Sequence, residues 1–419
     1  MKKSEILDFI KRNKNFMFLW SSHLMSVVTI NIINFVLITR IYEKTESTLA
    51  ISFLWIFYFL PSFFLGPFSG IFADRLDKRK ILIFTNILQS LVVLLLLLVK
   101  DEIYPIYPIV FLYSLVDEFY VPAQASCVPG LVKKNDLPLA NSLLLLTSQS
   151  SLILGVAISG IMIRFFGYNI PILISSLLLM VAGIVVQSLP AVKTQSKKWE
   201  ASLSNFWEEI KTGYFFIRET RLIFFPLLLI IVFQIFIAVF GVTAPVFARN
   251  LLQIQLQDAG PLLVIPLGLG SLSGALIMAK NFGKFRKRNL MKYGFIIAFF
   301  VMMMLSVVLP FLGRYKTLMA IPLMYLLGLA GLLVYIANQT LVQEKTPENL
   351  RGRVFGTLGF LIHLATLPCL LFTSTIVDFL GIRVFTFLAA MLILTMFLSF
   401  DQIERFILLK QTKKLAVNK

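Results

Sequence analysis

Histidine and cysteine are almost absent from this chain, which has two of each among 419 residues. The cysteines, Cys127 and Cys369, stand far apart and lack the spacing of metal ligands, so we interpret both as small apolar residues. Charge is scarce as well, at 14% of the residues against 58% hydrophobic, which is far from the balance of a soluble domain. We therefore expect no metal site, no cofactor and no catalytic residues.

What the chain has instead is a series of long apolar runs. They recur over its whole length, and each is close to the twenty or so residues that a helix needs to cross a bilayer. Because the runs lack the alternation of barrel strands, the predicted fold class is an all-α membrane protein. The predicted spans are 16–39, 48–72, 81–99, 105–131, 138–163, 168–190, 222–246, 259–280, 291–311, 317–343, 353–377 and 381–400.

These twelve spans fall into two groups of six, which predicts four parts in the chain. They are an N-terminal half (1–190), a cytoplasmic linker (191–221), a C-terminal half (222–400) and a cytoplasmic tail (401–419). Within the linker, Trp199, Phe206 and Trp207 stand among charges, which indicates a helix lying on the inner membrane surface. The alternative is a solvated tether whose aromatic residues are incidental.

The net charge of +18 suggests nucleic-acid binding, but its distribution argues against it. With a cytoplasmic N-terminus, the predicted spans place 31 of the 39 Lys and Arg residues on the cytoplasmic side. This asymmetry is the positive-inside rule, so both termini are expected in the cytoplasm. The expected partner of the basic residues is the lipid bilayer, with its anionic headgroups, and not nucleic acid. The first apolar run is too long for a signal-peptide core and is expected to stay as the first span.

A basic loop recurs at equivalent places in the two halves. In each half a helix end rich in Gly and Ser runs into a basic cytoplasmic loop, and four residues match at a separation of 204: Leu65, Gly66, Ser69 and Gly70 with Leu269, Gly270, Ser273 and Gly274. Such small residues also occur at ordinary helix contacts in membranes. Their recurrence at the equivalent loop favours an internal duplication, on which alternating-access transporters are built.

The first of these loops resembles the signature loop of the major facilitator superfamily, Gly-x-x-x-Asp-Arg-x-Gly-Arg-Arg/Lys. The matching residues are Gly70, Asp74, Arg75, Lys78 and Arg79, with Asp77 where the family usually has glycine. The resemblance implies a gating loop, in which Asp74 and Arg75 form a cytoplasmic latch that breaks when the halves rock. The alternative, plain positive-inside anchoring, suits Lys80 well and explains Asp74 poorly.

Other segments resemble one bacterial branch of that superfamily, which contains macrolide-efflux and enterobactin-export proteins. The segments are "FYVPAQASCVPGLVKKNDLPLANSL" and "QEKTPENLRGRVF". The resemblance implies export across the bacterial cytoplasmic (inner) membrane. Two features of this chain depart from the pattern of that branch and of drug/proton antiporters. Tyr113 stands where the branch often has a basic residue, and the fifth span has Gly155 and Gly160 without the proline of the antiporter element.

Ionisable groups in the middle of a span are rare because a charged side chain there costs about 3 kcal/mol. The clearest case is the pair Asp117 and Glu118 in the fourth span, which we interpret as proton-coupling candidates. Consecutive residues project about 100° apart on a helix, so both cannot face one cavity fully. Asp117 shares its face with Tyr113, Tyr120 and Gln124 and is the first choice for the cavity, with Glu118 second. Alternatively, the acids pair with a structural partner.

Further polar residues occur singly inside the spans. They are the candidates for a substrate cavity: His23, Asn31, Asn34, Tyr113, Gln124, Gln234, Tyr335, Asn338, Gln339 and His363. Each alone is more often an interhelical contact than a ligand contact. Together with 40 Phe and 14 Met residues, they predict a large, mostly apolar pocket suited to a small amphipathic organic substrate.

The predicted function is a monomeric secondary active transporter, a proton-coupled exporter of drug-, macrolide- or siderophore-like molecules. One alternative is a lysophospholipid or metabolite transporter or uniporter without proton antiport. Another is a polytopic membrane enzyme, which the two distant histidines and the lack of a phosphate-binding glycine loop disfavour. A receptor is a third alternative, and no soluble sensing domain is evident to support it.

Overall fold

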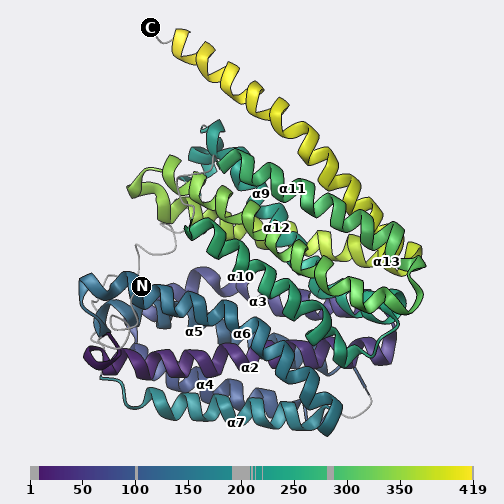
Figure 1. The fold of residues 1–419 in the computed structure, drawn as a ribbon. Helices are drawn as coiled ribbons and strands as arrows, with labels where there is room; N and C mark the ends of the chain where they lie inside the picture. Colours follow the sequence, from purple (N-terminus) through teal and green to yellow (C-terminus); the bar gives the residue numbers. More distant parts are fainter. Residues whose placement is uncertain are drawn as a thin grey trace. The chain divides into compact units, whose positions relative to one another are not determined.

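A computed structural model describes residues 9–99, 102–190, 208, 211–212, 214–218, 220–280 and 287–417. Within these residues the regular secondary structure is helical, with no β-strand, which confirms the all-α class (Figure 1). Contacts divide the chain into two compact units. Unit 1 comprises Met1–Glu46 and Phe53–Phe206, and unit 2 comprises Ser47–Ser52 and Trp207–Lys419. The four domain limits stay a prediction, and the linker residues Trp199, Phe206 and Trp207 lie outside the described residues.

Unit 1 is a bundle of long helices, coloured purple to blue in Figure 1. Its main packing pairs are α2 with α6 and α7, and α4 with α5 and α7. The helices are α2 (Lys14–Thr45), α3 (Thr48–Arg75), α4 (Lys78–Leu95), α5 (Ile106–Leu131), α6 (Leu137–Phe166) and α7 (Asn169–Val186).

Unit 2 repeats this arrangement with its own helices, coloured teal to yellow. Here α12 packs on α9, α10 and α11, while α13 packs on α9 and α11. The helices are α9 (Arg221–Val246), α10 (Ile265–Lys280), α11 (Lys287–Met303), α12 (Lys316–Lys345) and α13 (Glu348–Val417). Short π-helical turns extend three of these elements: Phe247–Leu252, Gly260–Val264 and Met304–Val308.

Ten helices of the described residues are long and apolar enough to cross a membrane, so the protein is a multi-pass membrane protein. The predicted span 81–99 falls on α4, which starts with Lys78, Arg79 and Lys80 and is not among the ten. The last two predicted spans both fall in α13, where two helices join at Gly381. Gly381 has φ 82°, a left-handed conformation that a residue without Cβ adopts readily. The count of twelve stays a prediction.

Local capping explains how the loop after α3 turns into α4. Asp77 is the N-cap residue of α4, and its carboxylate accepts the backbone N–H of Arg79 at 3.0 Å. The side chain thereby satisfies one of the N–H groups that a helix start leaves unpaired. The guanidinium of Arg79 donates to the carbonyl of Gln187 at the end of α7. The aspartate at the usual glycine position therefore gives this loop a capped turn.

A second capping interaction lies within unit 2, which includes the first residues of α3 as part of Ser47–Ser52, and it involves Asp378 of α13. Its carboxylate accepts the backbone N–H groups of Thr48 at 2.9 Å and Leu49 at 3.2 Å, at the start of α3. The hydroxyl of Ser47 also donates to it, at 2.7 Å. The negative charge lies at the positive end of a helix, which stabilises both groups.

Close helix approach depends on glycine at two places. A Cβ on Gly155 of α6 would lie 2.6 Å from the Cβ of Asn31 on α2. In unit 2, a Cβ on Gly328 of α12 would lie 1.9 Å from the carbonyl oxygen of Leu267 on α10. Both contacts exclude any larger side chain, which is the usual basis of tight helix pairs in membranes. Gly155 is one of the two glycines that remain of the expected antiporter element.

Candidate functional site

The acidic pair lies near the middle of α5, one turn before a proline. Pro122 lies inside the helix and has no N–H, so the backbone carbonyl of Glu118 has no partner four residues ahead. Asp117 and Glu118 are both partly buried in unit 1. The proline therefore interrupts the helical hydrogen bonds one turn after the two carboxyl groups.

The two carboxyl groups contact different neighbouring helices. The side-chain amide of Gln89 on α4 donates to Asp117 Oδ1 at 2.9 Å. The hydroxyl of Ser62 on α3 donates to Glu118 Oε1. Within the described residues neither carboxylate forms a salt bridge. Both acids are thus held by neutral donors, so no neighbouring cation fixes their charge. The expectation that Asp117 faces a substrate cavity stays a prediction.

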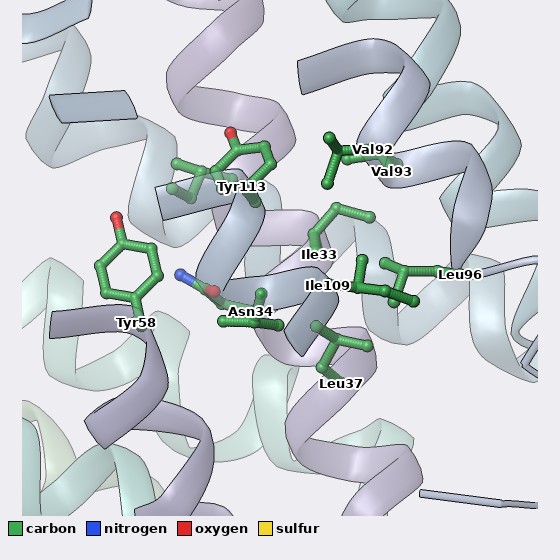
Figure 2. Close-up of a pocket in the computed structure, with 11 residues that line it drawn as sticks. Ile33, Asn34, Leu37, Tyr58, Val92, Val93, Leu96, Ile109 and Tyr113 are labelled. Atoms are coloured by element: carbon green, nitrogen blue, oxygen red, sulfur yellow. The ribbon is translucent and has the colours of Figure 1, made fainter. Parts of the chain in front are cut away.

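A small cavity lies one turn from Asp117, toward the N-terminal end of α5. Its volume is about 10 Å³, and it lies between α2, α3, α4 and α5. Figure 2 shows Asn34, Tyr58 and Tyr113 around it, together with apolar side chains such as Ile33, Leu37 and Leu96. Of the predicted cavity residues, the structure brings Asn34 and Tyr113 together here. Its size suits a water molecule and not an organic substrate.

Other candidates on α2 and α5 have more local contacts. His23 is buried, and its Nε2 lies 3.1 Å from the hydroxyl of Ser148 on α6. Asn31 donates to the carbonyl of Val27 in its own helix, at 2.7 Å. Gln124 is buried on α5. In this structure His23 joins α2 to α6, as a polar interhelical contact does.

The candidates in unit 2 are spread over three helices. Tyr335 on α12 stacks on Phe233 of α9, with ring centroids 4.9 Å apart. Asn338 is buried and donates to the carbonyl of Val334, and its Oδ1 has no hydrogen-bond partner among the described residues. The remaining candidates, Gln234, Gln339 and His363, are partly buried. The stacked pair Phe233–Tyr335 is an aromatic contact between α9 and α12.

The structure describes the side chains of only some of the gating-loop residues. Gly70, Asp74 and Arg75 belong to the last turns of α3, and their side chains lie outside the described residues. Lys78 and Arg79 begin α4 and are partly buried. The latch at Asp74 and Arg75 therefore stays a prediction.

Sequence reasoning missed the partners of the acids, Gln89 and Ser62, and the cavity residue Tyr58. It searched for ionisable groups and passed over neutral donors. A signal was present, because an otherwise apolar run contains four polar residues at helical spacing: Thr85, Asn86, Gln89 and Ser90. It also missed Arg40, which is buried in α2 and donates to the carbonyl of Val99.

This geometry defines a class of protein. Membrane-crossing helices form two units with corresponding packing pairs, and carboxyl groups lie inside one unit. No group of three or more His, Cys, Asp or Glu side chains in the described part of the chain could hold a metal ion. The class is a polytopic membrane transporter. The family model of the Major Facilitator Superfamily matches residues 19–368, and the chain therefore belongs to that superfamily.

Similar proteins agree with this assignment. The chain is 24% identical over 386 residues to macrolide efflux protein A of Streptococcus pyogenes, covering 90% of this chain and 92% of the relative. It is also 24% identical over 366 residues to the protein described as bacilysin exporter BacE of Bacillus subtilis (strain 168), covering 83% and 84%.

Solved structures share the fold. The nucleoside transporter NupG superposes with a TM-score of 0.71 at 12% identity, covering 93% of this chain and 98% of that one. A bacterial homologue of the iron transporter ferroportin, in an inward-facing state, gives a TM-score of 0.65 at 14% identity, covering 93% and 98%. At these identities the likeness concerns the fold alone.

Proposed function

We propose that the protein is a proton-coupled exporter of small amphipathic organic molecules, working by alternating access. The observation that carries the proposal is the acidic pair Asp117 and Glu118 in a membrane-crossing helix, bound by Gln89 and Ser62 and by no cation among the described residues. A carboxylate without a cation is costly at that place in a membrane. Binding a proton or a cationic substrate removes that cost, which makes the two exchange for one another.

The substrate class follows from the apolar surroundings and from the relatives. The candidate polar groups are few among many apolar and aromatic side chains, which suits an amphipathic molecule better than a sugar or a nucleotide. Two relatives are named for the export of a macrolide and of bacilysin. We therefore propose that this chain is an efflux protein of the same kind and that it acts as a monomer. A macrolide-like compound is the first probe to test.

The orientation follows from charge. In the bacterial cytoplasmic membrane, the excess of Lys and Arg assigns the N-terminus, the linker 191–221 and the C-terminus to the cytoplasm. The acids on α5 are then reached from the exterior when the transporter faces outward, and from the cytoplasm when it faces inward.

The experiment is substrate accumulation in cells with and without the protein, screened over macrolides, siderophores, dyes and lysophospholipids. We expect lower accumulation of at least one organic compound in producing cells, and a protonophore should abolish the difference. The double variant Asp117→Asn, Glu118→Gln, made at equal abundance, is the matched control. Export that survives the protonophore would contradict proton coupling, and would favour a uniporter or a lipid-handling protein.

A further inference from the structure

The helix α3 is divided between the two units. Its first residues, as part of Ser47–Ser52, belong to unit 2 together with α13, whereas the rest of the helix belongs to unit 1. In unit 1 the hydroxyl of Ser114 on α5 donates to the backbone carbonyl of Tyr58 on α3. One turn further on, Ser62 of α3 donates to Glu118 of α5. One continuous helix therefore forms hydrogen bonds in both units.

The carboxylate of Asp378 holds the start of this helix in unit 2. It accepts the backbone N–H groups of Thr48 at 2.9 Å and Leu49 at 3.2 Å. It also accepts the hydroxyls of Ser47 at 2.7 Å and Thr48 at 2.5 Å. Hydrogen bonds to a charged group are roughly twice as strong as bonds between neutral groups, and the positive end of a helix adds to them. A single side chain of α13 therefore supplies most of the polar contacts of this helix start.

Buried hydroxyl groups continue the contact along the two helices. On α13, the residues Leu370, Ser374 and Asp378 recur every fourth position and share one face. On α3, Thr48 and Ser52 do the same, and both are 0% exposed, as is Ser374. The hydroxyl of Ser52 forms a hydrogen bond with that of Ser374 and lies 3.3 Å from the carbonyl oxygen of Leu370. We call the contact of these five residues the exterior seam, because the charge distribution assigns both helix ends to the outer side.

The chemistry of the exterior seam allows it to open and close. Asp378 is exposed, so its charge is already in contact with water at the surface of the seam. When the seam opens, its N–H and hydroxyl groups exchange protein partners for water, and the net free energy of such an exchange is small for each bond. A seam of large apolar side chains would instead expose its buried area to water, which opposes opening. Small polar residues therefore suit a contact that breaks in every cycle.

We propose that Asp378 is the latch of the exterior seam. While its carboxylate caps α3 the seam stays closed, and release of the cap lets the start of α3 leave α13 as the transporter opens outward. The inference rests on the proposed function, because alternating access requires the exterior side to open once per cycle. A plain structural cap would act differently. Its removal would weaken the helix start and leave the balance between the inward- and outward-open states unchanged.

The first test measures how often the seam opens. In a variant with both native cysteines replaced by alanine, Ser52→Cys places a single thiol at a position that is 0% exposed. A thiol reagent that does not cross membranes is added to intact cells, so labelling reports opening toward the exterior.

Removal of the cap should speed this labelling. We expect Asp378→Ala to raise the labelling rate about tenfold, which is the effect of losing one hydrogen bond to a charged group. Asp378→Asn should lie between the two, because its amide oxygen still accepts an N–H but carries no charge. Glu102→Ala, which removes an exposed acid between α4 and α5, is the matched control and should leave the rate unchanged. An unchanged rate in both Asp378 variants would overturn the proposal.

The second test distinguishes a latch from a plain cap. Spin labels are attached at two exposed residues on the predicted outer side, Phe166 of unit 1 and Tyr315 of unit 2, in the purified protein in lipid nanodiscs. Electron spin resonance then records the distribution of distances between the labels. We expect Asp378→Ala to raise the ratio of long to short distances about tenfold, and Glu102→Ala to leave it unchanged. The same distribution in Asp378→Ala as in the unmodified protein would show a plain cap and contradict the latch. Neither test uses a substrate or a proton gradient, so a failure of the export proposal would be seen separately.

Discussion

The side-chain amide of Gln89 donates to the carboxylate of Asp117 at 2.9 Å, across the packed pair α4 and α5. A neutral amide holds the carboxylate in place without cancelling its charge, whereas a lysine or arginine would fix the charged form. A carboxyl group bound in this way keeps its orientation in both protonation states. The contact therefore suits a group that must gain and lose a proton in each transport cycle.

Replacing Gln89 tests this contact. Gln89→Leu keeps the approximate volume and removes the donor, and a hydrogen bond to a charged group is worth about 1.5–3 kcal/mol. We expect proton-driven export to fall about tenfold at equal protein abundance, measured as the initial rate of efflux from cells. Gln187→Leu, at the exposed end of α7, is the control and should export normally. Normal export by both variants would show that the amide of Gln89 does not contribute to proton-driven export.

Gly155 fixes the distance between α6 and α2. A methyl group there would lie 2.6 Å from the Cβ of Asn31, so Gly155→Ala forces the helices apart. Overpacking of this kind costs about 1–3 kcal/mol, which a lower unfolding temperature of the purified protein should reveal. Gly359→Ala is the matched control, because nothing lies within 4 Å of its added methyl and alanine favours a helix. An unchanged unfolding temperature for Gly155→Ala would contradict the close approach.

Two substitutions in and beside the gating loop distinguish a latch from simple positive-inside anchoring. Asp74→Asn keeps the size of the side chain and removes its charge. If Asp74 forms part of a latch, this variant should lose most of its transport activity while its expression stays normal. Lys80→Gln removes one exposed positive charge from α4 and should have a much smaller effect. Efflux rates and membrane abundance, measured together, distinguish these outcomes. Equal tolerance of both changes would leave the loop with positive-inside anchoring alone.

Topology is tested with a reporter protein fused at defined positions. A fusion after Lys419 should report the cytoplasm, as should an insertion in the linker 191–221. An insertion at Arg314, between α11 and α12, should report the exterior. These expectations follow from the charge distribution and from an even number of spans. A cytoplasmic signal at Arg314 would refute the twelve-span topology.

Much of the fold was accessible from the sequence, because a bilayer restricts the chain to helices and sets their length. The predicted span 105–131 and the observed α5 (Ile106–Leu131) differ by a single residue. The apolar run 81–99 predicted a helix where α4 (Lys78–Leu95) lies, although α4 begins with three basic residues, and its crossing of the membrane stays a prediction. The gap between the predicted spans 353–377 and 381–400 lies directly before Gly381, where the two helices of α13 join.

The details of the site were less accessible. Asp117 and Glu118 could be found because charge is costly inside a membrane, and this cost depends on residue type alone. Their partners Gln89 and Ser62 depend on how α3, α4 and α5 are rotated against one another, which helical periodicity of a single segment does not fix. The cap at Asp77 was missed for a different reason. The aspartate was considered only as a departure from a family glycine, although aspartate before a basic helix start is a common N-cap.

The central claim is that the acidic pair couples export to protons, and transport by the purified protein in liposomes tests it most directly. With a macrolide as probe and an imposed proton gradient, the unmodified protein should concentrate the probe against its own gradient. Asp117→Asn or Glu118→Gln should abolish this uphill movement and still allow probe to exchange down its gradient. If both variants concentrate the probe as the unmodified protein does, the account is contradicted, and His23 and His363 become the next proton sites to examine.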